Sequence, residues 1–290
     1  MHYLDDKHLR SLTTDWSSLL DVITAASSLI EAGHFAQPLK PYLRYNNPQN
    51  RIIAMPAYIG GEINAAGIKW IASFPGNLEL GLPRAHSVLI LNEAATGRPR
   101  ALLNSALPST LRTAAVSGSL LREALQQRPM NEKLRIGIIG WGPIGQQHYQ
   151  MCAELFEEFI SEILLYDLRG IDESSYEESL LAGRTRAVSS WQEVLTKANV
   201  IITCTAASQR YIDIAPAEGS LLLNVSLRDY KLNALAHIQT IIVDDWQEVC
   251  RENTEIEMLH KQRGLIKEDT LTLSEVLHDG ALSNTRPSAR

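Results

Sequence analysis

The feature that most constrains the fold is an apolar, β-prone run that leads directly into a glycine-rich turn, LRIGIIGWGPIG at 134–145. The turn has the spacing G-x-G-x-x-G, in which Gly140 allows a tight turn, Gly142 lets the backbone approach a pyrophosphate, and Gly145 permits close helix–strand packing. The helix expected next would direct its N-terminal amides at phosphate groups. The motif therefore predicts a Rossmann domain, an α/β fold with a doubly wound parallel sheet, that binds a dinucleotide.

A second apolar run, at 163–166, ends on an acidic residue, Asp167, about 20 residues after the glycine motif. A carboxylate at that distance accepts hydrogen bonds from the ribose hydroxyls and repels a 2′-phosphate, so NAD is favoured over NADP. Arg169, two residues further on, would soften that preference. The positions predicted to bind the cofactor are Gly140, Gly142, Pro143, Ile144, Gly145, Asp167 and Thr205.

Composition and charge narrow the class of protein. The chain has 290 residues, 45% of them apolar and 21% charged, which is typical of a soluble globular protein with two ordinary domains. A net charge of −6 gives no reason to expect nucleic acid or a membrane surface as partner, and no run approaches the ~18 apolar residues of a membrane span. The three cysteines lack C-x-x-C spacing and the N-terminus is unlike a signal peptide, so we expect a cytoplasmic protein with inert thiols. The eight histidines have no metal-binding spacing, and no metal is predicted.

The glycine motif lies near the middle of the chain and so predicts two domains. In the first, residues 1–115, we expect a helix at 15–32, strands at 52–58, 68–71 and 87–91, a turn at 92–99 and a returning strand at 101–103. A helix at 109–127, capped by Ser109 or Thr110, leads into the second domain, residues 116–290. Its predicted helices are at 176–181 and 190–198, and its later strands at 200–205, 221–225 and 240–245. Residues 281–290 are polar and without periodicity, which predicts a disordered tail.

Basic residues lie inside strand-like or helical stretches of the first domain, an unusual place for charge. Lys69, in GIKWI at 67–71, either extends its ammonium to solvent or faces a cleft and binds an anion. Arg44 lies in PYLRY at 41–45 and Arg112 in STLRTAA at 109–115, and the planar fork of arginine suits bidentate binding of a carboxylate. Taken one at a time, each of these residues is more simply explained as a surface charge.

Together with long stretches elsewhere, these residues resemble the ornithine cyclodeaminase/μ-crystallin family. The similar stretches cover nearly the whole chain and are KPYLR at 40–44, NRIIAMPAY at 50–58, GIKWIASFP at 67–75, NVSLRD at 224–229 and VDDWQEVCRENT at 243–254. The resemblance implies an N-terminal α+β substrate and dimerisation domain, an NAD-binding Rossmann domain after it, and a homodimer. It also implies that Arg44 and Arg112 hold the substrate α-carboxylate. Lys69 would lie beside the reacting group, and Asp229 would be the acid/base.

Within the family, these stretches are most similar to the branch that oxidises N-(2-amino-2-carboxyethyl)-L-glutamate with NAD. Hydride leaves the Cα, Asp229 accepts the amine proton, and water hydrolyses the iminium ion to 2,3-diaminopropionate and 2-oxoglutarate. The resemblance places this reaction in siderophore or related secondary-metabolite biosynthesis. A substrate with three carboxylates would use further cations, for which Arg51 and Arg84 are candidates by position. His86 is another candidate, equally well explained as a structural histidine.

Other activities on the same scaffold are alternatives. An ornithine cyclodeaminase would form proline and ammonia while its NAD is regenerated, and an imine reductase or alanine dehydrogenase would act on a different amine. A binding protein of the μ-crystallin type would keep the nucleotide and lose turnover. That last alternative rests on one departure, because the family continues past the position of Arg290 with an apolar segment that returns to the first domain. Without the resemblance, Asp229 would be interpreted as a turn residue after a strand.

Overall fold

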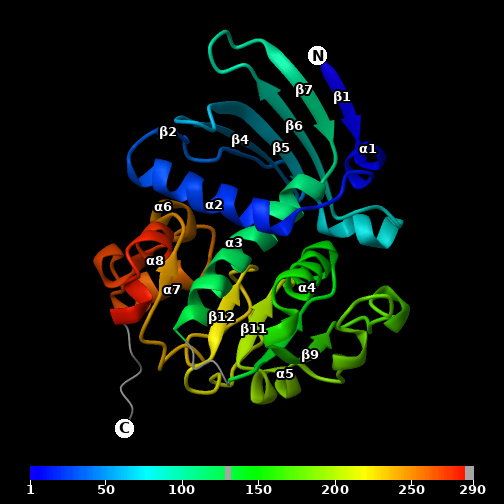
Figure 1. Cartoon of the computed structure of the whole chain (residues 1–290), viewed down its shortest axis with the longest axis vertical. Coiled ribbons are helices and arrows are strands. Elements are labelled where there is room, and N and C mark those ends of the chain that lie inside the picture. Colours follow the sequence, from blue (N-terminus) through cyan, green and yellow to red (C-terminus); the bar gives the residue numbers. More distant parts are fainter. Residues whose placement is uncertain (128–131, 285–290) are drawn as a thin grey trace. The chain divides into compact units, whose positions relative to one another are not determined.

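The computed structural model describes residues 1–127 and 132–284, and the chain divides into two compact units (Figure 1). The first unit contains residues 1–15 and 22–112, and the second contains 16–21 and 113–290. The second domain predicted from the sequence begins at residue 116 and does not include residues 16–21. In the structure these residues form the start of α2 (Trp16–Glu31) and belong to the second unit. Burial explains this placement, because Trp16 and Leu20 are 2% and 1% exposed and Leu20 lies against Gly118.

The first unit is built on one mixed sheet in the order β1-β7-β6-β5-β4-β2, with β3 paired to β4. Its strands are β1 (His2–Asp5), β2 (Phe35–Ala36), β3 (Tyr42–Leu43), β4 (Arg51–Ile59), β5 (Ala65–Ser73), β6 (Ala85–Asn92) and β7 (Pro99–Asn104). Its helical segments are α1 (Asp6–Arg10), most of α2, η1 (Pro75–Leu80) and the start of α3 (Leu107–Gln126). The strands predicted at 52–58, 68–71, 87–91 and 101–103 are confirmed, each within a longer strand. The predicted cap of α3 is wrong, since the helix begins at Leu107, whose N–H donates to Ser105 Oγ at 3.0 Å.

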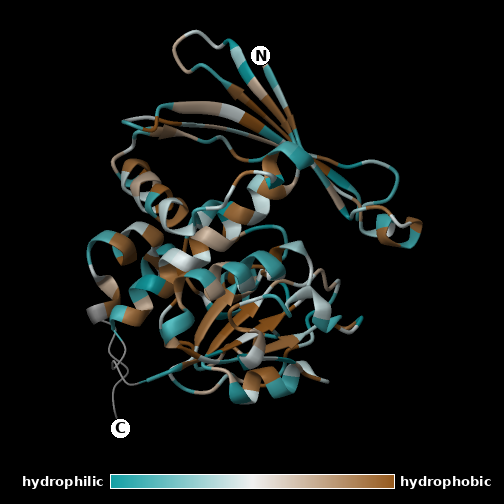
Figure 2. Ribbon diagram, turned by 45° about the vertical axis from the view of Figure 1, so that its right-hand side comes forward, coloured by the Kyte–Doolittle hydropathy of each residue, from teal (hydrophilic) through white to brown (hydrophobic). Residues whose placement is uncertain are grey.

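The second unit contains a five-stranded parallel sheet in the order β10-β9-β8-β11-β12. Its strands are β8 (Leu134–Ile139), β9 (Ile160–Tyr166), β10 (Thr185–Ala187), β11 (Val200–Thr203) and β12 (Leu221–Asn224). Besides most of α3 and the start of α2, its α-helices are α4 (Pro143–Leu155), α5 (Trp191–Lys197), α6 (Trp246–Val249), α7 (Glu255–Arg263) and α8 (Leu273–His278). Figure 2 shows the strands of this sheet as almost uniformly hydrophobic, as expected of parallel strands covered on both faces. The predicted Rossmann fold is confirmed.

Three sequence-based expectations for the second unit are corrected. Residues 176–181 form turns between the 3-10 helices η3 (Glu173–Ser175) and η4 (Ala182–Arg184), because the N–H groups of Ser179 and Ala182 bond to carbonyls three residues back, at 3.0 Å each, as in successive turns. The strand expected at 240–245 is only β13 (Ile242–Val243), which pairs with β14 (Leu271–Thr272) in a separate two-stranded sheet. Of the predicted disordered tail, Ala281–Asn284 form the 3-10 helix η6, and residues 285–290 lie outside the described residues. Within the described ranges, no helix is both long enough and apolar enough to cross a membrane.

Candidate functional site

The glycine turn follows β8, at the point where the strand order of the sheet reverses. β8 lies between β9 and β11, and doubly wound folds bind ligands at the carboxyl edge of such strands. Gly140 has φ 102°, and a Cβ there would lie 2.7 Å from the carbonyl carbon of Cys204. A Cβ on Gly145 would lie 2.0 Å from the carbonyl oxygen of Gly140. Backbone crowding therefore requires glycine at both positions.

The remaining glycine of the motif, Gly142, is explained by open space and not by backbone crowding. Gly142 precedes α4 with φ −80°, and a Cβ there would meet no atom within 4 Å, so this glycine leaves open space at the start of the helix. Pro143, the first residue of α4, has no N–H, while the first-turn amides of Ile144 and Gly145 have no carbonyl ahead of them in the helix. Open space beside free helix amides fits the pyrophosphate of a dinucleotide.

Asp167 lies beside the same turn, directly after β9. Its Oδ2 accepts a hydrogen bond from the main-chain N–H of Trp141 at 2.8 Å. Its Oδ1 accepts hydrogen bonds from the main-chain N–H and the side-chain Nε–H of Arg169, at 3.0 and 3.2 Å. Burial acts to raise the pKa of this carboxyl, but the hydrogen bonds from Arg169 and Trp141 outweigh burial and hold the pKa below its usual value. Asp167 is therefore an ionised acceptor, suited to ribose hydroxyl groups.

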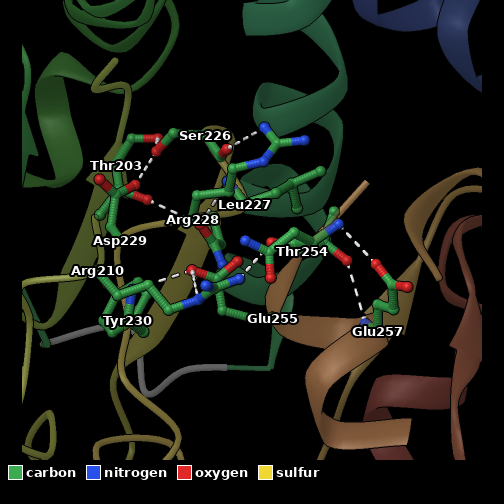
Figure 3. Close-up of polar contacts among 12 residues, drawn as sticks. Thr203, Arg210, Ser226, Leu227, Arg228, Asp229, Tyr230, Thr254, Glu255 and Glu257 are labelled. Atoms are coloured by element: carbon green, nitrogen blue, oxygen red, sulfur yellow. Dashed lines mark hydrogen bonds and ion pairs between the residues drawn. The ribbon is translucent and has the colours of Figure 1, made fainter. Parts of the chain in front are cut away.

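Asp229 follows β12 and is fully buried. Its two carboxylate oxygens accept hydrogen bonds from the hydroxyls of Thr205 and Ser226 (Figure 3 shows Ser226 and Asp229). Thr205, predicted to bind the cofactor, thus contacts the predicted acid/base directly. Ser226 was not among the predicted site residues, although it stands three positions before Asp229 in a stretch that carries the family resemblance. These contacts give the carboxylate two hydroxyl groups through which a proton can reach it.

The loop that carries Asp229 has an unusual backbone. Leu227 has φ 60°, a left-handed conformation that a bulky residue adopts at a cost of about 1–3 kcal/mol. Asn224 supports it, since its Oδ1 accepts the N–H of Leu227 and the hydroxyl of Thr203, each at 3.1 Å. Backbone strain of this kind concentrates at functional sites, which fits a role for the neighbouring carboxylate.

In the first unit, the sheet register brings several of the predicted cations onto one face. Tyr42 pairs with Ile53, Arg51 with Ser73, and Lys69 with Met55, so Tyr42, Arg51 and Lys69 point to the same side of adjacent strands. The Cζ atoms of Arg44 and Arg51 lie 4.9 and 5.7 Å from the ring centroid of Tyr42, within cation–π range. Tyr42 therefore holds two guanidinium groups close together.

Lys69, on the same face, is partly buried near other positive charges. Burial, together with the positive charges of Arg112 and Lys40, lowers the pKa of Lys69 from 10.5 to about 7. Among the described residues, no hydrogen bond or ion pair is made by its ammonium group. A half-buried amine that repels two neighbouring cations is suited to bind an anion or to exchange a proton near neutral pH.

Two more sequence candidates lie at the start of β6. His86 pairs with Ala72, and because alternate residues of a strand point to opposite faces, it lies on the face opposite to Lys69. Arg84 precedes β6, where its carbonyl accepts the N–H of Phe74 at 2.9 Å, and its role as a substrate cation stays a prediction. Within the described ranges, no cluster of His, Cys, Asp and Glu side chains could hold a metal ion.

The chain belongs to the ornithine cyclodeaminase/mu-crystallin family, whose model matches residues 8–225. Among curated proteins, N-((2S)-2-amino-2-carboxyethyl)-L-glutamate dehydrogenase of Staphylococcus aureus is 34% identical over 253 residues, which cover 83% of this chain and 73% of that protein. The family membership predicted from the sequence is confirmed.

Solved structures with a similar fold include two oxidoreductases. The Thermococcus litoralis Δ(1)-pyrroline-2-carboxylate reductase, in complex with NADH and L-proline, matches with a TM-score of 0.81 and 21% identity, over 97% of this chain and 87% of that one. An archaeal alanine dehydrogenase dimer with bound NAD matches with a TM-score of 0.70 and 23% identity, over 100% of this chain and 87% of that one. At these identities the likeness concerns the fold.

Proposed function

We propose that the protein is an NAD-dependent dehydrogenase that acts on the CH–NH group of N-(2-amino-2-carboxyethyl)-L-glutamate. Oxidation of the secondary amine at the glutamate Cα and hydrolysis of the iminium ion by water give 2,3-diaminopropionate, 2-oxoglutarate and NADH. The 34% identity to the Staphylococcus aureus dehydrogenase supports this substrate. As the family resemblance implies, the product would serve siderophore or related secondary-metabolite biosynthesis.

The second unit would hold the cofactor. The open space at Gly142 and the first-turn amides of Ile144 and Gly145 would receive the pyrophosphate, and Asp167 would accept the ribose hydroxyls. When bound, NAD accepts the hydride that leaves the Cα of the substrate. Pro143 fixes the backbone of the first helical residue and carries no N–H, so the amides of Ile144 and Gly145 would be the donors to the pyrophosphate.

The chain's own residues would bind the carboxylates and move protons. Arg44, Arg51 and Arg112 are assigned to the substrate carboxylates. Asp229 is assigned as the acid/base that takes the amine proton, since an amine must be unprotonated before hydride can leave its α-carbon. Thr205 and Ser226 hold both of its oxygens, so a proton can pass to Asp229 through a hydroxyl while the carboxylate stays out of bulk water.

The observation that carries this proposal is the environment of Lys69. Its amine has neighbouring cations but no ion pair among the described residues, and burial favours its neutral form. A substrate with three carboxylates supplies the missing negative charge. A neutral amine with a pKa near 7 can also accept or return the proton that the hydrolysis step requires.

The test is to mix the protein with NAD and N-(2-amino-2-carboxyethyl)-L-glutamate, and to follow NADH absorbance beside 2-oxoglutarate release. We expect both products in equal amounts, and Asp229→Asn should lose turnover by about 100-fold or more while it still binds NAD, because general acid/base catalysis contributes about 10²–10⁴-fold. Turnover that survives Asp229→Asn would contradict the assigned role.

The alternatives predict other products from the same protein. Ammonia and proline formed from ornithine without net NADH would identify a cyclodeaminase. Consumption of NADH with a cyclic imine, or NADH formed from alanine, would identify a reductase or an alanine dehydrogenase. NAD binding measured by titration, without turnover of any of these compounds, would leave a nucleotide-binding protein.

We also propose a cytoplasmic homodimer. Tyr58 and Trp70 are 38% and 46% exposed, and they lie on the face of the first unit's sheet opposite to Lys69. An exposed aromatic sheet face favours association with a second copy. Free thiols at Cys152, Cys204 and Cys250 fit a reducing compartment. Light scattering on the purified protein would measure the dimer mass directly.

A further inference from the structure

The segment Glu252–Glu255, which leads into α7 and includes its first residue, is hydrogen-bonded to the loop that carries Asp229. The N–H of Glu255 donates to the carbonyl of Leu227 at 3.1 Å, and the Oε1 of Glu255 accepts the N–H of Tyr230 at 3.0 Å. The guanidinium group of Arg228 donates to the carbonyl of Glu252 at 3.0 and 3.1 Å. The residues on both sides of Asp229 in the sequence are therefore bonded to this segment, and Figure 3 shows these residues together.

Both partners in this contact have left-handed backbone conformations. Leu227 has φ 60°, and across from it Glu252 and Asn253 have φ 61° and 58°. Such conformations persist in non-glycine residues only where surrounding contacts hold them. Arg210 contributes to that support, because its guanidinium group donates to the carbonyl of Asn253. The position of Asp229 thus depends on contacts from a part of the chain about 25 residues away.

Glu255 is the central group of this contact, and its burial has a cost. The residue is 1% exposed, Arg210 Nε lies 4.0 Å from its Oε1, and its Oε2 has no hydrogen-bond partner among the described residues. Burial raises the pKa of Glu255, and the negative charge of Asp229 adds to that rise. A buried carboxyl group with one oxygen unsatisfied destabilises a fold, so its presence here is better explained by what it holds than by stability.

We propose that Glu255 is a positioning residue for Asp229. By accepting the N–H of Tyr230 and donating its own N–H to Leu227, it fixes the backbone on both sides of the acid/base and so sets the position of the carboxylate. The proposal rests on the proposed function. Substitution of Glu255 changes its side chain but leaves its main-chain N–H in place. The test therefore addresses the bond between the Glu255 carboxylate and the Tyr230 N–H, and not the bond from Glu255 to the Leu227 carbonyl.

A nearby acid provides the control. Glu257 lies in the same first turn of α7, so it interacts similarly with the helix dipole. Its carboxylate accepts the N–H of Asn253 at 2.6 Å and pairs with Lys261, and among the described residues it makes no hydrogen bond or ion pair with residues 226–230. If substitution of Glu255 acted only by weakening the start of α7, substitution of Glu257 should lower the rate as well.

The experiment compares Glu255→Ala, Glu255→Gln and Glu257→Gln in the NADH assay. We expect Glu255→Ala to lower kcat by about 100-fold, the cost of a displacement of about 1 Å in a catalytic group, with KM for NAD and the melting temperature near wild type. Glu255→Gln keeps an oxygen that can accept the Tyr230 N–H and should recover most of the rate. Glu257→Gln removes the same first-turn charge but keeps an oxygen that can accept the Asn253 N–H, so it should keep the wild-type rate. Wild-type kcat in Glu255→Ala, or equal losses of rate in all three variants, would overturn the proposal.

Hydrogen exchange separates this proposal from the proposed function. In Glu255→Ala the backbone amides of Leu227–Tyr230 should exchange faster than in the wild type, while Glu255→Gln should restore their protection. This result would support the positioning role even if the wild-type protein does not oxidise N-(2-amino-2-carboxyethyl)-L-glutamate. Unchanged exchange across Leu227–Tyr230 in Glu255→Ala would refute it whatever the substrate.

Discussion

Replacement of Lys69 by methionine should make the protein more stable and less active. Methionine is unbranched and close to lysine in length, so it can occupy the same position in β5 between Met55 and Leu89. The substitution removes a positive charge that burial, Arg112 and Lys40 all disfavour. It also removes the group that we assign to an anionic substrate.

The pKa of Lys69 gives the size of the expected gain. A fall from 10.5 to about 7 corresponds to about 5 kcal/mol at 1.36 kcal/mol per unit of pKa. Lys69 keeps some contact with solvent, so we expect about 2–4 kcal/mol of additional unfolding free energy for Lys69→Met at neutral pH. The loss of a charge-assisted hydrogen bond, about 1.5–3 kcal/mol, should raise KM for the amine roughly 10- to 100-fold.

The pH dependence has a definite sign. The folded-state pKa of Lys69 lies below its unfolded value, so between pH 7 and 10.5 the unfolded chain holds a proton that the folded chain has lost. Stability of the wild type should therefore rise with pH across this window. The advantage of Lys69→Met should be full below about pH 7 and vanish as the pH approaches 10.5.

Urea unfolding at several pH values, followed by circular dichroism, measures this difference. The exposed Lys7, on α1 of the same unit, provides a matched control, because Lys7→Met should change neither stability nor KM appreciably. Equal or lower stability of Lys69→Met at pH 7, or a gain that does not shrink at higher pH, would refute the reasoning.

Two further predictions concern the second unit. Burial lowers the pKa of His148 from 6.5 to about 4, so the unfolded chain gains a proton first as the pH falls. Urea unfolding should show that the unfolding free energy falls by up to about 3 kcal/mol between pH 6.5 and 4, and that it falls less in His148→Gln. The same dependence on pH in the variant and the wild type would contradict this role of His148. Gly142→Ala should melt at the wild-type temperature but bind NAD about 10-fold more weakly in a titration, because its methyl group enters the space assigned to the pyrophosphate. Gly145→Ala should unfold more easily by about 3 kcal/mol or more, since its Cβ would meet a backbone oxygen at 2.0 Å, and equal melting temperatures for the two variants would contradict this distinction.

The sequence predicted the parts of the site that depend on local structure. A β-prone run followed by Gly140, Gly142 and Gly145 requires a tight strand-to-helix turn, and spacing alone placed Asp167 at the end of the next strand. The spacing of apolar residues likewise predicted α2 and most strands, because side chains on one face of a helix or strand recur at the period of its backbone. The family resemblance, rather than periodicity, identified Arg44, Lys69, Arg112 and Asp229 as site candidates.

Contacts between distant segments decided the rest. Strand register separates His86 from Lys69, and only the fold shows which charges lower the pKa of that lysine. Only the folded structure shows that the Ser226 hydroxyl bonds to Asp229 and that Glu255, the first residue of α7, bonds to the loop that carries Asp229. The sequence by itself thus determined the Rossmann turn and its fit to a dinucleotide. Burial, register and the environment of each charge arose from long-range packing, because desolvation and hydrogen bonding depend on neighbours that are remote in sequence.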